Sequence, residues 1–360
     1  MPRLLFIAAH RPNRSPSQRF RFEQYIPFLE QNGYTCDFSW LVSPNDDLFL
    51  YQEGYAIKKI MFLIKTYYIR LQDLLKAKHY DIIFIQREAI MFRSVFFEKT
   101  FAKKTKIIFD FDDAIWLMDI SDGNKKYKWF KDPSKISKII QLSHLIFAGN
   151  KYLAEYASRF NNNITIIPTT IDTEYHKKMN YDKPNEKICI GWTGSTTTIK
   201  HFDMAVPFLI KLKEKFGSQI YFKLIGSATY TNPSLELKGT KWQINKEIQD
   251  LSEIDIGIMP LPDNEWSKGK CGFKGLQYMA MEIPTIMSPI GVNNEIIQDN
   301  VNGYLASSEE EWVEKISNLI LSKNLRTLFG EKGRQTIIEK YSVQSTKKTY
   351  LENFNELIKK

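Results

Sequence analysis

The sequence predicts an α/β protein built from two doubly wound domains with a cleft between them. Its 360 residues exceed what one compact core usually holds. Buried-strand patterns alternate with helical patterns, which is typical of a parallel sheet. The alternation stops at a polar, proline-containing stretch, 181–187, and then starts again. We therefore expect an N-terminal domain over 1–172, a linker over 173–187 and a C-terminal domain over 188–341.

The first half supplies the elements of the N-terminal domain. Short apolar or alternating runs predict strands at Leu4–Ala9, Tyr34–Leu41, Asp81–Gln86, Lys106–Phe111, Leu145–Ala148 and Ile164–Ile167. Helical spacing predicts one helix over Gln18–Gln31, which Gly33 ends, and a second over Ile57–Leu75.

The helix expected over Ile57–Leu75 is strongly amphipathic. Its apolar residues fall on one side, namely Ile57, Met61, Ile64, Tyr68, Leu71 and Leu75. In the simplest interpretation, this side faces the protein's own core. The alternative is contact with an anionic membrane, because the helix also carries Lys58, Lys59, Lys65 and Arg70.

The second half repeats the pattern. Strands are predicted at Ile188–Trp192, Ile220–Ile225, Ile256–Met259 and Thr285–Ser288. Helices are predicted through Phe202–Lys215, in the apolar stretch before Pro284, near Glu309–Ser322 and over Ser342–Lys360.

Composition and charge narrow the class of protein. The formal net charge is +9, and most of it lies in 1–170, where 25 Lys and Arg face 17 Asp and Glu, a difference of +8. This basicity suits an anionic membrane or nucleic acid, but zinc-finger, RRM and KH signatures are absent, so we expect no nucleic acid partner. The three cysteines form no CxxC pair, which argues against a zinc site or a disulfide framework.

The N-terminus and the hydropathy favour a cytoplasmic location. The first apolar run is too short for a secretory signal, and Arg11, Pro12 and Arg14 follow it at once. No run of about 18 apolar residues would span a membrane. We expect a cytoplasmic protein that can make peripheral contact with the inner face of the cell membrane.

The most informative segment is 266–305, because lysines and glycines are interleaved near its start. Two lysines stand one helical turn apart among three glycines, namely Lys270, Lys274, Gly269, Gly272 and Gly275. Glycines let a backbone approach a ligand closely, and lysines at a helix N-terminus attract phosphate. We therefore expect an anionic ligand, in particular a diphosphate. Lysines that merely solvate the surface are the alternative.

The loop GWTGSTTTIKH, which begins within the strand predicted at Ile188–Trp192, is a second phosphate-binding candidate. Its backbone N–H groups and hydroxyls can hold phosphates, and Lys200 falls in the first helical turns after it. The spacing matches neither GxxxxGK[ST] nor GxGxxG. An ordinary strand-to-helix turn therefore explains the loop equally well.

Charged residues also follow two strands of the first domain, at the sheet edge where ligands bind. The first strand is followed by His10, Arg11, Arg14, Arg19 and Arg21. Arginine side chains suit phosphate or carboxylate groups, although a solvated basic loop is the alternative. Gln86, Arg87 and Glu88 follow another strand, where they can join an acceptor pocket or form an Arg–Glu structural pair.

An acidic turn stands in Phe109–Trp116. Asp110 is expected at the end of a strand, with Asp112 and Asp113 directly after it. Adjacent carboxylates can activate a hydroxyl, bind a cation or cap the next helix. The Asp-Phe-Asp spacing is superficially similar to a metal-binding DxD motif, but we expect no metal site.

Together these motifs resemble a bacterial branch of the family 4 glycosyltransferases, which have the GT-B fold. The resemblance rests on the order and spacing of SPSQRFR, QRE, DFDDAIW, AGNKYLAEYA, IPTTID, GWTGS and GKCGFKGLQYMAMEIP over nearly the whole chain. It implies two Rossmann-like domains, with a nucleotide-sugar held mainly by the C-terminal one. It also implies that the last helix, 342–360, packs back on the N-terminal domain.

The resemblance assigns roles to individual residues. Those expected at the donor are Gly191, Thr193, Gly194, Ser195, Lys200, Lys270, Lys274, Gln277 and Glu295. Those expected on the acceptor side are Arg14, Arg19, Arg87 and Glu88, with Asp112 and Asp113 beside the reacting sugar. The family's Glu-x7-Glu pair is replaced by Gly269 and Gln277, so the donor sugar stays unassigned.

The activity implied is that of a hexosyltransferase-like enzyme. It moves a sugar from a nucleotide-sugar to a hydroxyl of a glycan or lipid-linked acceptor in cell-envelope polysaccharide synthesis, with retention of configuration and without a metal or other cofactor. Two alternatives stay open. One is a catalytically inactive homologue that serves as a nucleotide-binding or scaffold subunit, and the other is a GT-B nucleotide-sugar epimerase.

Overall fold

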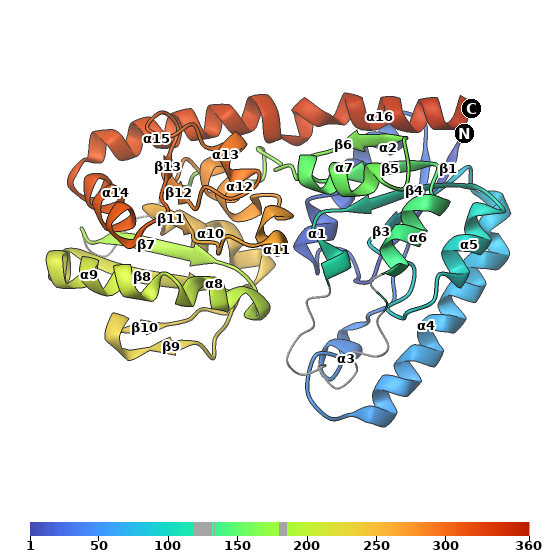
Figure 1. Cartoon of the computed structure of the whole chain (residues 1–360), viewed down its shortest axis with the longest axis horizontal. Coiled ribbons are helices and arrows are strands. Elements are labelled where there is room, and N and C mark those ends of the chain that lie inside the picture. Colours follow the sequence, from blue (N-terminus) through green and yellow to red (C-terminus); the bar gives the residue numbers. More distant parts are fainter. Residues whose placement is uncertain (118–131, 133, 180–185, 360) are drawn as a thin grey trace. The chain divides into compact units, whose positions relative to one another are not determined.

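The computed structural model describes residues 1–117, 132, 134–179 and 186–359, which form two α/β units (Figure 1). Unit 1 comprises Met1–Thr169 and Lys347–Lys360, and unit 2 comprises Thr170–Thr346. The chain therefore first passes from unit 1 to unit 2 after Thr169, three residues before the boundary expected at 172. Part of the expected linker belongs to unit 2, because Thr173 and His176 are buried there. Residues 180–185 of that linker lie outside the described part of the chain.

Within the described residues, unit 1 contains a six-stranded, all-parallel sheet in the order β2-β1-β3-β4-β5-β6. The strands are β1 Arg3–Ile7, β2 Thr35–Ser39, β3 Ile82–Gln86, β4 Lys106–Phe111, β5 Leu145–Ala148 and β6 Ile164–Ile166. Most are continuous apolar runs, as expected when helices cover both faces. The strand order reverses between β1 and β3, and ligands bind at such a reversal beyond the carboxyl ends of the strands.

The described helices of unit 1 are α1 Pro16–Arg19, α2 Ile26–Gln31, α3 Pro44–Asp47, α4 Ala56–Lys76, α5 Phe96–Ala102, α6 Ser134–Leu142 and α7 Lys151–Ser158. The single helix predicted over Gln18–Gln31 is wrong. The chain there forms α1, a 3-10 turn at Glu23–Tyr25, and α2. Pro27 stands in the first turn of α2, and it cannot donate the hydrogen bond that would continue an earlier helix.

Helix α4 forms where it was predicted, but its orientation contradicts the simplest interpretation. The side buried against unit 1 carries Phe62, Thr66 and Arg70, whereas the apolar side faces solvent. Arg70 is fully buried, and its guanidinium donates to the carbonyl oxygens of Ala8 at 3.0 Å and Ala89 at 2.5 Å. Arg70 therefore holds the helix on unit 1 and cannot contribute to a membrane-facing surface.

Within the described residues, unit 2 contains a five-stranded, all-parallel sheet in the order β13-β12-β11-β7-β8. The strands are β7 Ile188–Thr193, β8 Ile220–Ile225, β11 Ile256–Met259, β12 Thr285–Met287 and β13 Tyr304–Leu305. A short hairpin, β9 Thr231–Asn232 with β10 Leu237–Lys238, lies outside this sheet. The strand order reverses between β7 and β11, which marks the expected ligand-binding edge of this unit.

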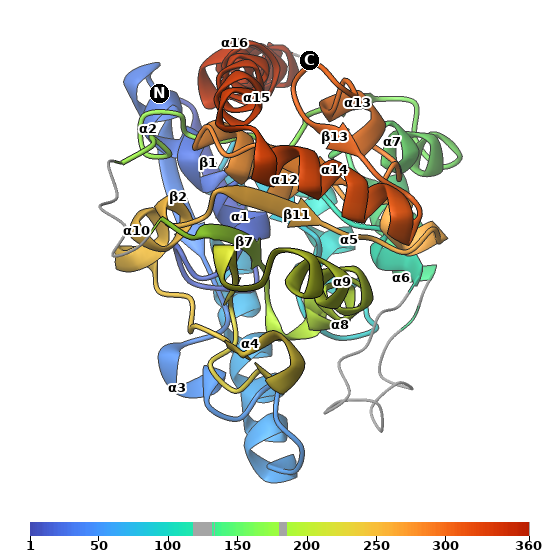
Figure 2. The same cartoon turned by 90° about the vertical axis from the view of Figure 1, so that its left-hand side faces the viewer.

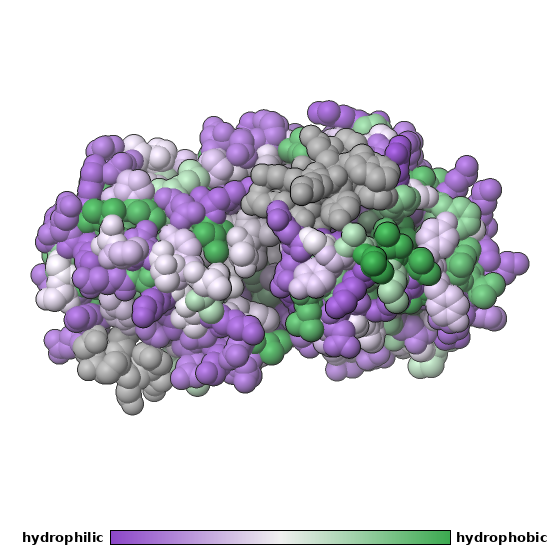
Figure 3. All heavy atoms as spheres, turned by 90° about the horizontal axis from the view of Figure 1, so that it is seen from below, coloured by the Kyte–Doolittle hydropathy of each residue, from purple (hydrophilic) through white to green (hydrophobic). Residues whose placement is uncertain are grey.

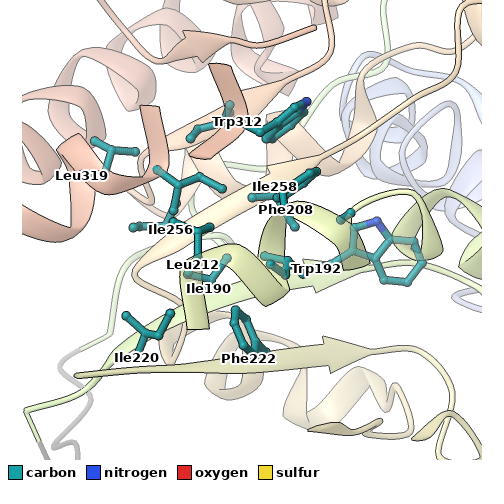
Figure 4. Packing of buried hydrophobic residues seen from close by; sticks show 14 of the residues in the cluster. Ile190, Trp192, Phe208, Leu212, Ile220, Phe222, Ile256, Ile258, Trp312 and Leu319 are labelled. Carbon is teal, nitrogen blue, oxygen red and sulfur yellow. The ribbon is translucent and has the colours of Figure 1, made fainter. Parts of the chain in front are cut away.

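The described helices of unit 2 are α8 Ile199–Asp203, α9 Val206–Phe216, α10 Glu247–Ser252, α11 Glu265–Lys268, α12 Phe273–Ala280, α13 Asn293–Ile296, α14 Glu309–Leu321 and α15 Lys323–Thr336 (Figure 2). The helix predicted through Phe202–Lys215 is divided into α8 and α9, and Pro207 stands in the first turn of α9. Side chains of β7 and β11 pack with Phe208 and Trp312, whose rings stack 4.9 Å apart, to form the larger core of this unit (Figure 4).

The last helix, α16 Val343–Lys359, begins in unit 2 and ends in unit 1. Its unit 1 portion is firmly packed, because the Tyr350 ring stacks on Tyr25 with centroids 4.3 Å apart and Asn355 accepts a 2.6 Å hydrogen bond from the Tyr34 hydroxyl. Near the start of α16, the Val343 N–H donates to the carbonyl of Ile171 at 3.1 Å. The two stretches at which the chain passes between units are therefore bonded to each other within unit 2.

Candidate active site

In unit 2, the two segments predicted to bind phosphate lie side by side at the point where the strand order reverses. The Lys274 ammonium lies 5.3 Å from the centre of the Trp192 ring, near the end of β7. The Tyr278 hydroxyl, one turn further along α12, accepts a 2.7 Å hydrogen bond from the Thr193 N–H. Helix α12 is thereby attached to the end of β7, and Lys274 is held above it.

The N-terminus of α12 is built to attract an anion. Gly272 precedes the helix with φ of 69°, a left-handed conformation that glycine adopts readily, and a Cβ there would come within 2.2 Å of the Ile296 side chain. The helix dipole places partial positive charge at this end. Lys274 stands in the first turn, and Lys270, whose ammonium is 5.1 Å from the Trp266 ring centre, stands just before it. The positive charges therefore gather at one helix end.

Buried polar atoms near this helix end lack partners within the protein. In the described part of the chain, Trp192 Nε1, Ser267 Oγ and Asn293 Oδ1 are buried without a hydrogen-bond partner. Such an atom costs roughly 1–3 kcal/mol when it is left unpaired. Ser267 belongs to α11 and Asn293 to α13, the elements on either side of α12 in the sequence. Each unpaired group of this kind calls for an explanation, and a bound ligand or water is one.

Two glycines, Gly191 within β7 and Gly194 directly after it, have different explanations. A Cβ at Gly191 would come within 2.4 Å of the Ile254 side chain, so packing accounts for this glycine. A position beside the diphosphate stays a prediction for Gly191. A Cβ at Gly226, which has φ of +139°, would lie 1.8 Å from the carbonyl oxygen of Gly194. This close contact of two backbones shapes the turn that leaves β7.

The hydroxyl-rich part of the same loop bonds largely to itself. The Ser195 N–H donates to Thr198 Oγ1 at 3.0 Å, and the Ser195 and Thr197 hydroxyls lie 2.9 Å apart. The Thr193 N–H is bound to Tyr278. Lys200 follows in α8 with an exposed side chain. This geometry is that of a capped strand-to-helix turn, and phosphate binding by Ser195, Thr193 and Lys200 stays a prediction.

Gln277 is not placed to bind a ribose. It is 2 % exposed, and its amide donates to Glu247 Oε1 at 3.2 Å. The indole of Trp242 donates to the same oxygen at 3.2 Å, and His176 Nε2 lies 3.4 Å from the Gln277 amide. Gln277 therefore belongs to a buried polar network. No sequence pattern pointed to Glu247, which reaches Gln277 only through the fold.

Glu295 remains a candidate for the donor. It lies within α13 with an exposed side chain. Its neighbours Asn293 and Ile296 adjoin Gly272 at the start of α12. Asn293, which is fully buried, donates to the carbonyl of Ser288 at 2.9 Å and anchors α13 beside that helix.

In unit 1, the acidic turn after β4 is joined to the arginine after β3. Arg87 donates to Asp112 Oδ1 at 2.8 and 3.0 Å and to Asp113 Oδ2 at 2.6 Å. Burial raises the pKa of the Asp112 carboxyl, and the charge of Asp113 raises it further, while Arg87 opposes both effects. The side chains of Asp112 and Asp113 both bond to this arginine. We refer to these three residues as the Arg87–Asp cluster.

Asp110 has a separate, structural partner. Arg21 donates to Asp110 Oδ1 at 2.5 Å from Nη2 and at 3.1 Å from Nε, and it also donates to the carbonyl of Ile167. The side chains of Arg21 and Asp110 are 0 % and 2 % exposed. Asp110 is therefore occupied by a buried ion pair, and the DxD-like spacing does not bring Asp110 and Asp112 into one site.

The other charged residues of the unit 1 edge are paired in ways that the sequence did not reveal. Arg14 donates to Asp47 at 2.9 Å and 3.2 Å, and Arg11 donates to the same carboxylate at 2.6 Å. Glu88 accepts a 2.7 Å hydrogen bond from Lys135. Of the two interpretations of Arg87 and Glu88, the Arg–Glu structural pair is therefore not the arrangement that forms, because Arg87 bonds to Asp112 and Asp113 instead.

Two further groups complete this edge. The guanidinium of Arg19, a half-buried residue, lies 4.8 Å from the Phe20 ring centre. Burial and the charge of Arg14 lower the pKa of His10 to about 4. His10 also lies 3.1 Å from the Tyr51 hydroxyl. The edge is thus basic around Arg14 and Arg19, with His10 neutral at pH 7.

Comparison with known proteins shows which proteins share this architecture. Residues 187–322 match the family model described as glycosyl transferases group 1. An uncharacterised glycosyltransferase of Methanocaldococcus jannaschii is 23 % identical over 304 residues, which cover 76 % of each chain. A glycosyltransferase of Rickettsia africae superposes with a TM-score of 0.68 at 15 % identity, and the match covers 99 % of each chain. The chain has the GT-B fold and resembles the group 1 glycosyltransferases.

A third relative is a structure that holds a nucleotide-sugar. The Anabaena protein HepE, solved in complex with UDP-glucose, superposes with a TM-score of 0.62 at 12 % identity, covering 98 % of this chain and 99 % of that one. The segment that matches the glycosyltransferase family model contains Lys270, Lys274 and the loop after β7. Among the described residues, no helix is both long and apolar enough to cross a membrane.

Proposed function

We propose that this glycosyltransferase moves a sugar from a nucleoside-diphosphate sugar to a hydroxyl of a glycan or lipid-linked acceptor in cell-envelope polysaccharide synthesis. The observation that supports this most directly is the position of Lys274. Its ammonium lies above Trp192, in the first turn of α12 and beside the end of β7. Lys274, Lys270 and the helix dipole supply positive charge to a diphosphate at one point.

The same charges would assist the reaction. When the bond between the anomeric carbon and the diphosphate oxygen breaks, negative charge develops on the diphosphate, and preorganised positive groups stabilise it. This task requires no metal ion. The resemblance to family 4 implies retention of configuration, in which the acceptor oxygen attacks the face that the diphosphate leaves. The departing phosphate oxygen then takes the proton of the acceptor hydroxyl.

The Arg87–Asp cluster is the candidate for orienting the acceptor. Arg87 fixes both carboxylates through charge-assisted hydrogen bonds, which are stronger and more directional than neutral ones. A fixed carboxylate can accept a hydrogen bond from the attacking hydroxyl. Arg14 and Arg19 make this edge basic, which suits an acceptor that carries phosphate or carboxylate groups.

Nucleotide binding tests the donor site. UDP affinity, measured by isothermal titration calorimetry, should fall about 10- to 150-fold in Lys274→Ala, because a charge-assisted contact contributes roughly 1.5–3 kcal/mol. Lys268→Ala is the matched control, since its ammonium bonds to Glu265 at 2.7 Å and lies outside the proposed contact. Unchanged affinity in Lys274→Ala would remove this lysine from the donor site.

Turnover separates the proposed enzyme from its alternatives. In Asp112→Asn and Asp113→Asn, sugar transfer should fall strongly while UDP affinity stays at the wild-type value. If no nucleoside diphosphate and no nucleotide-sugar binds the wild-type protein, the proposal is refuted. Binding without transfer to any acceptor tried would instead support the inactive homologue. Release of a 2-epimer of the sugar would support the epimerase.

A further inference from the structure

Helix α4 presents its apolar side to solvent. Seven residues along this side are between 40 % and 78 % exposed, namely Ile57, Ile60, Met61, Ile64, Tyr68, Leu71 and Leu75. Apart from the adjacent pair Ile60 and Met61, they are spaced three or four residues apart. They therefore form one continuous line along the helix, which we call the α4 stripe. The 21 residues of α4 span roughly 31 Å. Figure 3 views unit 1 from the side on which α4 lies in Figure 1, and it shows apolar side chains grouped among hydrophilic ones.

The α4 stripe is exposed because the opposite side of the helix is fixed against the rest of unit 1. That side buries Arg70, whose guanidinium also bonds to Ser39 Oγ and to Asp73, both at 2.8 Å. Phe62 packs with Leu41 and Val42 in a small core cluster. Asp73 belongs to α4 itself, so the bonds that hold the helix are those from Arg70 to Ala8, Ser39 and Ala89. The helix cannot roll to bury the stripe without breaking these three bonds of a buried guanidinium.

The apolar surface continues beyond α4. Phe96, at the start of α5, is 45 % exposed, and its ring centre lies 6.5 Å from that of Tyr67, which is 40 % exposed. Tyr55, directly before α4, is 47 % exposed. Soluble monomers rarely expose a contiguous apolar area of this extent unless it binds a partner or a membrane.

The charge around the α4 stripe indicates which partner it fits. Residues 53–104 carry 11 Lys and Arg against 5 Asp and Glu. At 100° per residue, Lys58, Lys65 and Lys76 lie along one border of the stripe. Lys65 is paired with Asp46 at 2.5 Å, so Lys58 and Lys76 supply the positive charge of this border. Of the five acids, Asp73 is bonded to Arg70, and Glu98 is fully buried. An apolar line bordered by lysines is the pattern of a helix that lies in the plane of an anionic membrane.

We propose that α4 docks this protein on an anionic lipid surface, with the α4 stripe inserted at the boundary of headgroups and acyl chains. A second copy of the chain fits less well, because pairing two such stripes would also bring their lysines together. The proposal does not depend on the proposed transferase activity, since it concerns a surface in unit 1 and a binding step that needs no nucleotide.

Vesicle binding tests the proposal directly. The full chain should co-sediment with vesicles of phosphatidylcholine containing phosphatidylglycerol far more than with phosphatidylcholine alone, and added salt should weaken the binding. The double variant Ile60→Gln/Ile64→Gln should bind at least tenfold more weakly. Glutamine keeps helix propensity, and both isoleucines are exposed, so folding should be preserved. UDP affinity and circular dichroism check that it is.

The matched control is Leu321→Gln/Leu328→Gln, which removes two exposed leucines from unit 2. It should bind vesicles as the wild type does. Equal binding by the wild type and Ile60→Gln/Ile64→Gln would overturn the proposal. A dimer in light scattering that the Ile60→Gln/Ile64→Gln variant abolishes, together with no vesicle binding, would overturn it in favour of a second copy of the chain.

Discussion

The substitution Asp110→Asn tests whether the acidic turn divides into a structural and a functional part. In the wild type, Asp110 neutralises a guanidinium that is 0 % exposed. Asparagine has nearly the same shape but no charge, so it leaves Arg21 as an uncompensated cation inside unit 1. Removal of one partner from a buried ion pair typically destabilises a protein by about 3–5 kcal/mol.

This free energy translates into a large change in melting temperature. Unit 1 comprises 169 and 14 residues from its two segments, which is 183 in total. For domains of this size, each kcal/mol corresponds to roughly 2–4 °C, so the transition of unit 1 should fall by roughly 6–20 °C. Differential scanning calorimetry can follow this transition. Added UDP should stabilise unit 2 and so separate its unfolding transition from that of unit 1.

Two companion variants make the test specific. Asp112→Asn should melt within about 2 °C of the wild type, because Arg87 keeps its bond to Asp113. The double variant Arg21→Met/Asp110→Leu should recover most of the lost stability, since it removes both charges. Recovery should be incomplete because the carbonyl of Ile167 loses its donor. A melting temperature of Asp110→Asn equal to that of the wild type, or a double variant less stable than Asp110→Asn, would refute the reasoning.

Three further predictions follow from particular contacts. Gln277→Ala should lower the melting temperature of unit 2 without changing UDP affinity, whereas a loss of affinity would restore the ribose-binding hypothesis. His10 has a folded pKa of about 4 against 6.5 when exposed, so the unfolded chain binds more protons between these values and stability should rise with pH across that window. In His10→Gln, urea midpoints should lose this rise, and an unchanged slope would contradict the assignment. Gly226→Ala should destabilise the protein more than Gly217→Ala, because both positions have positive φ but only the first meets another backbone. Equal urea midpoints for these two variants would count against that contact.

Much of the fold is readable from local patterns. Lys106–Phe111, Leu145–Ala148, Ile220–Ile225 and Ile256–Met259 form strands with the bounds that were predicted. Apolar runs bounded by polar residues indicate buried parallel strands because both faces of the sheet are covered. The helices were less accurate where proline intervened, as at Pro27 and Pro207, since periodicity alone does not show where a helix must restart.

The candidate donor region stays a prediction, whereas the structure decides how the charged residues around it pair. Lys274 and the loop after β7 lie side by side because both follow strands at the point where the strand order reverses. The partner of each charged group could not be predicted from the sequence. Arg21 and Asp110 are 89 residues apart, and Gln277 and Glu247 are 30 apart. No local signal links residues so distant.

Some features of this protein therefore follow from its sequence alone, and others only from its tertiary structure. The sequence alone reveals the alternation of strands and helices, the polar loops that follow the strands, and the amphipathic line along α4. Each of these features depends on residues that are close together in the sequence. Packing alone reveals that Asp110 is structural while Asp112 and Asp113 share Arg87, that Gln277 is buried, and that α4 turns its apolar line outward. The reason is physical, because a local pattern groups side chains on one face of an element, while the free energy of burying or pairing them depends on what the rest of the chain brings to that face.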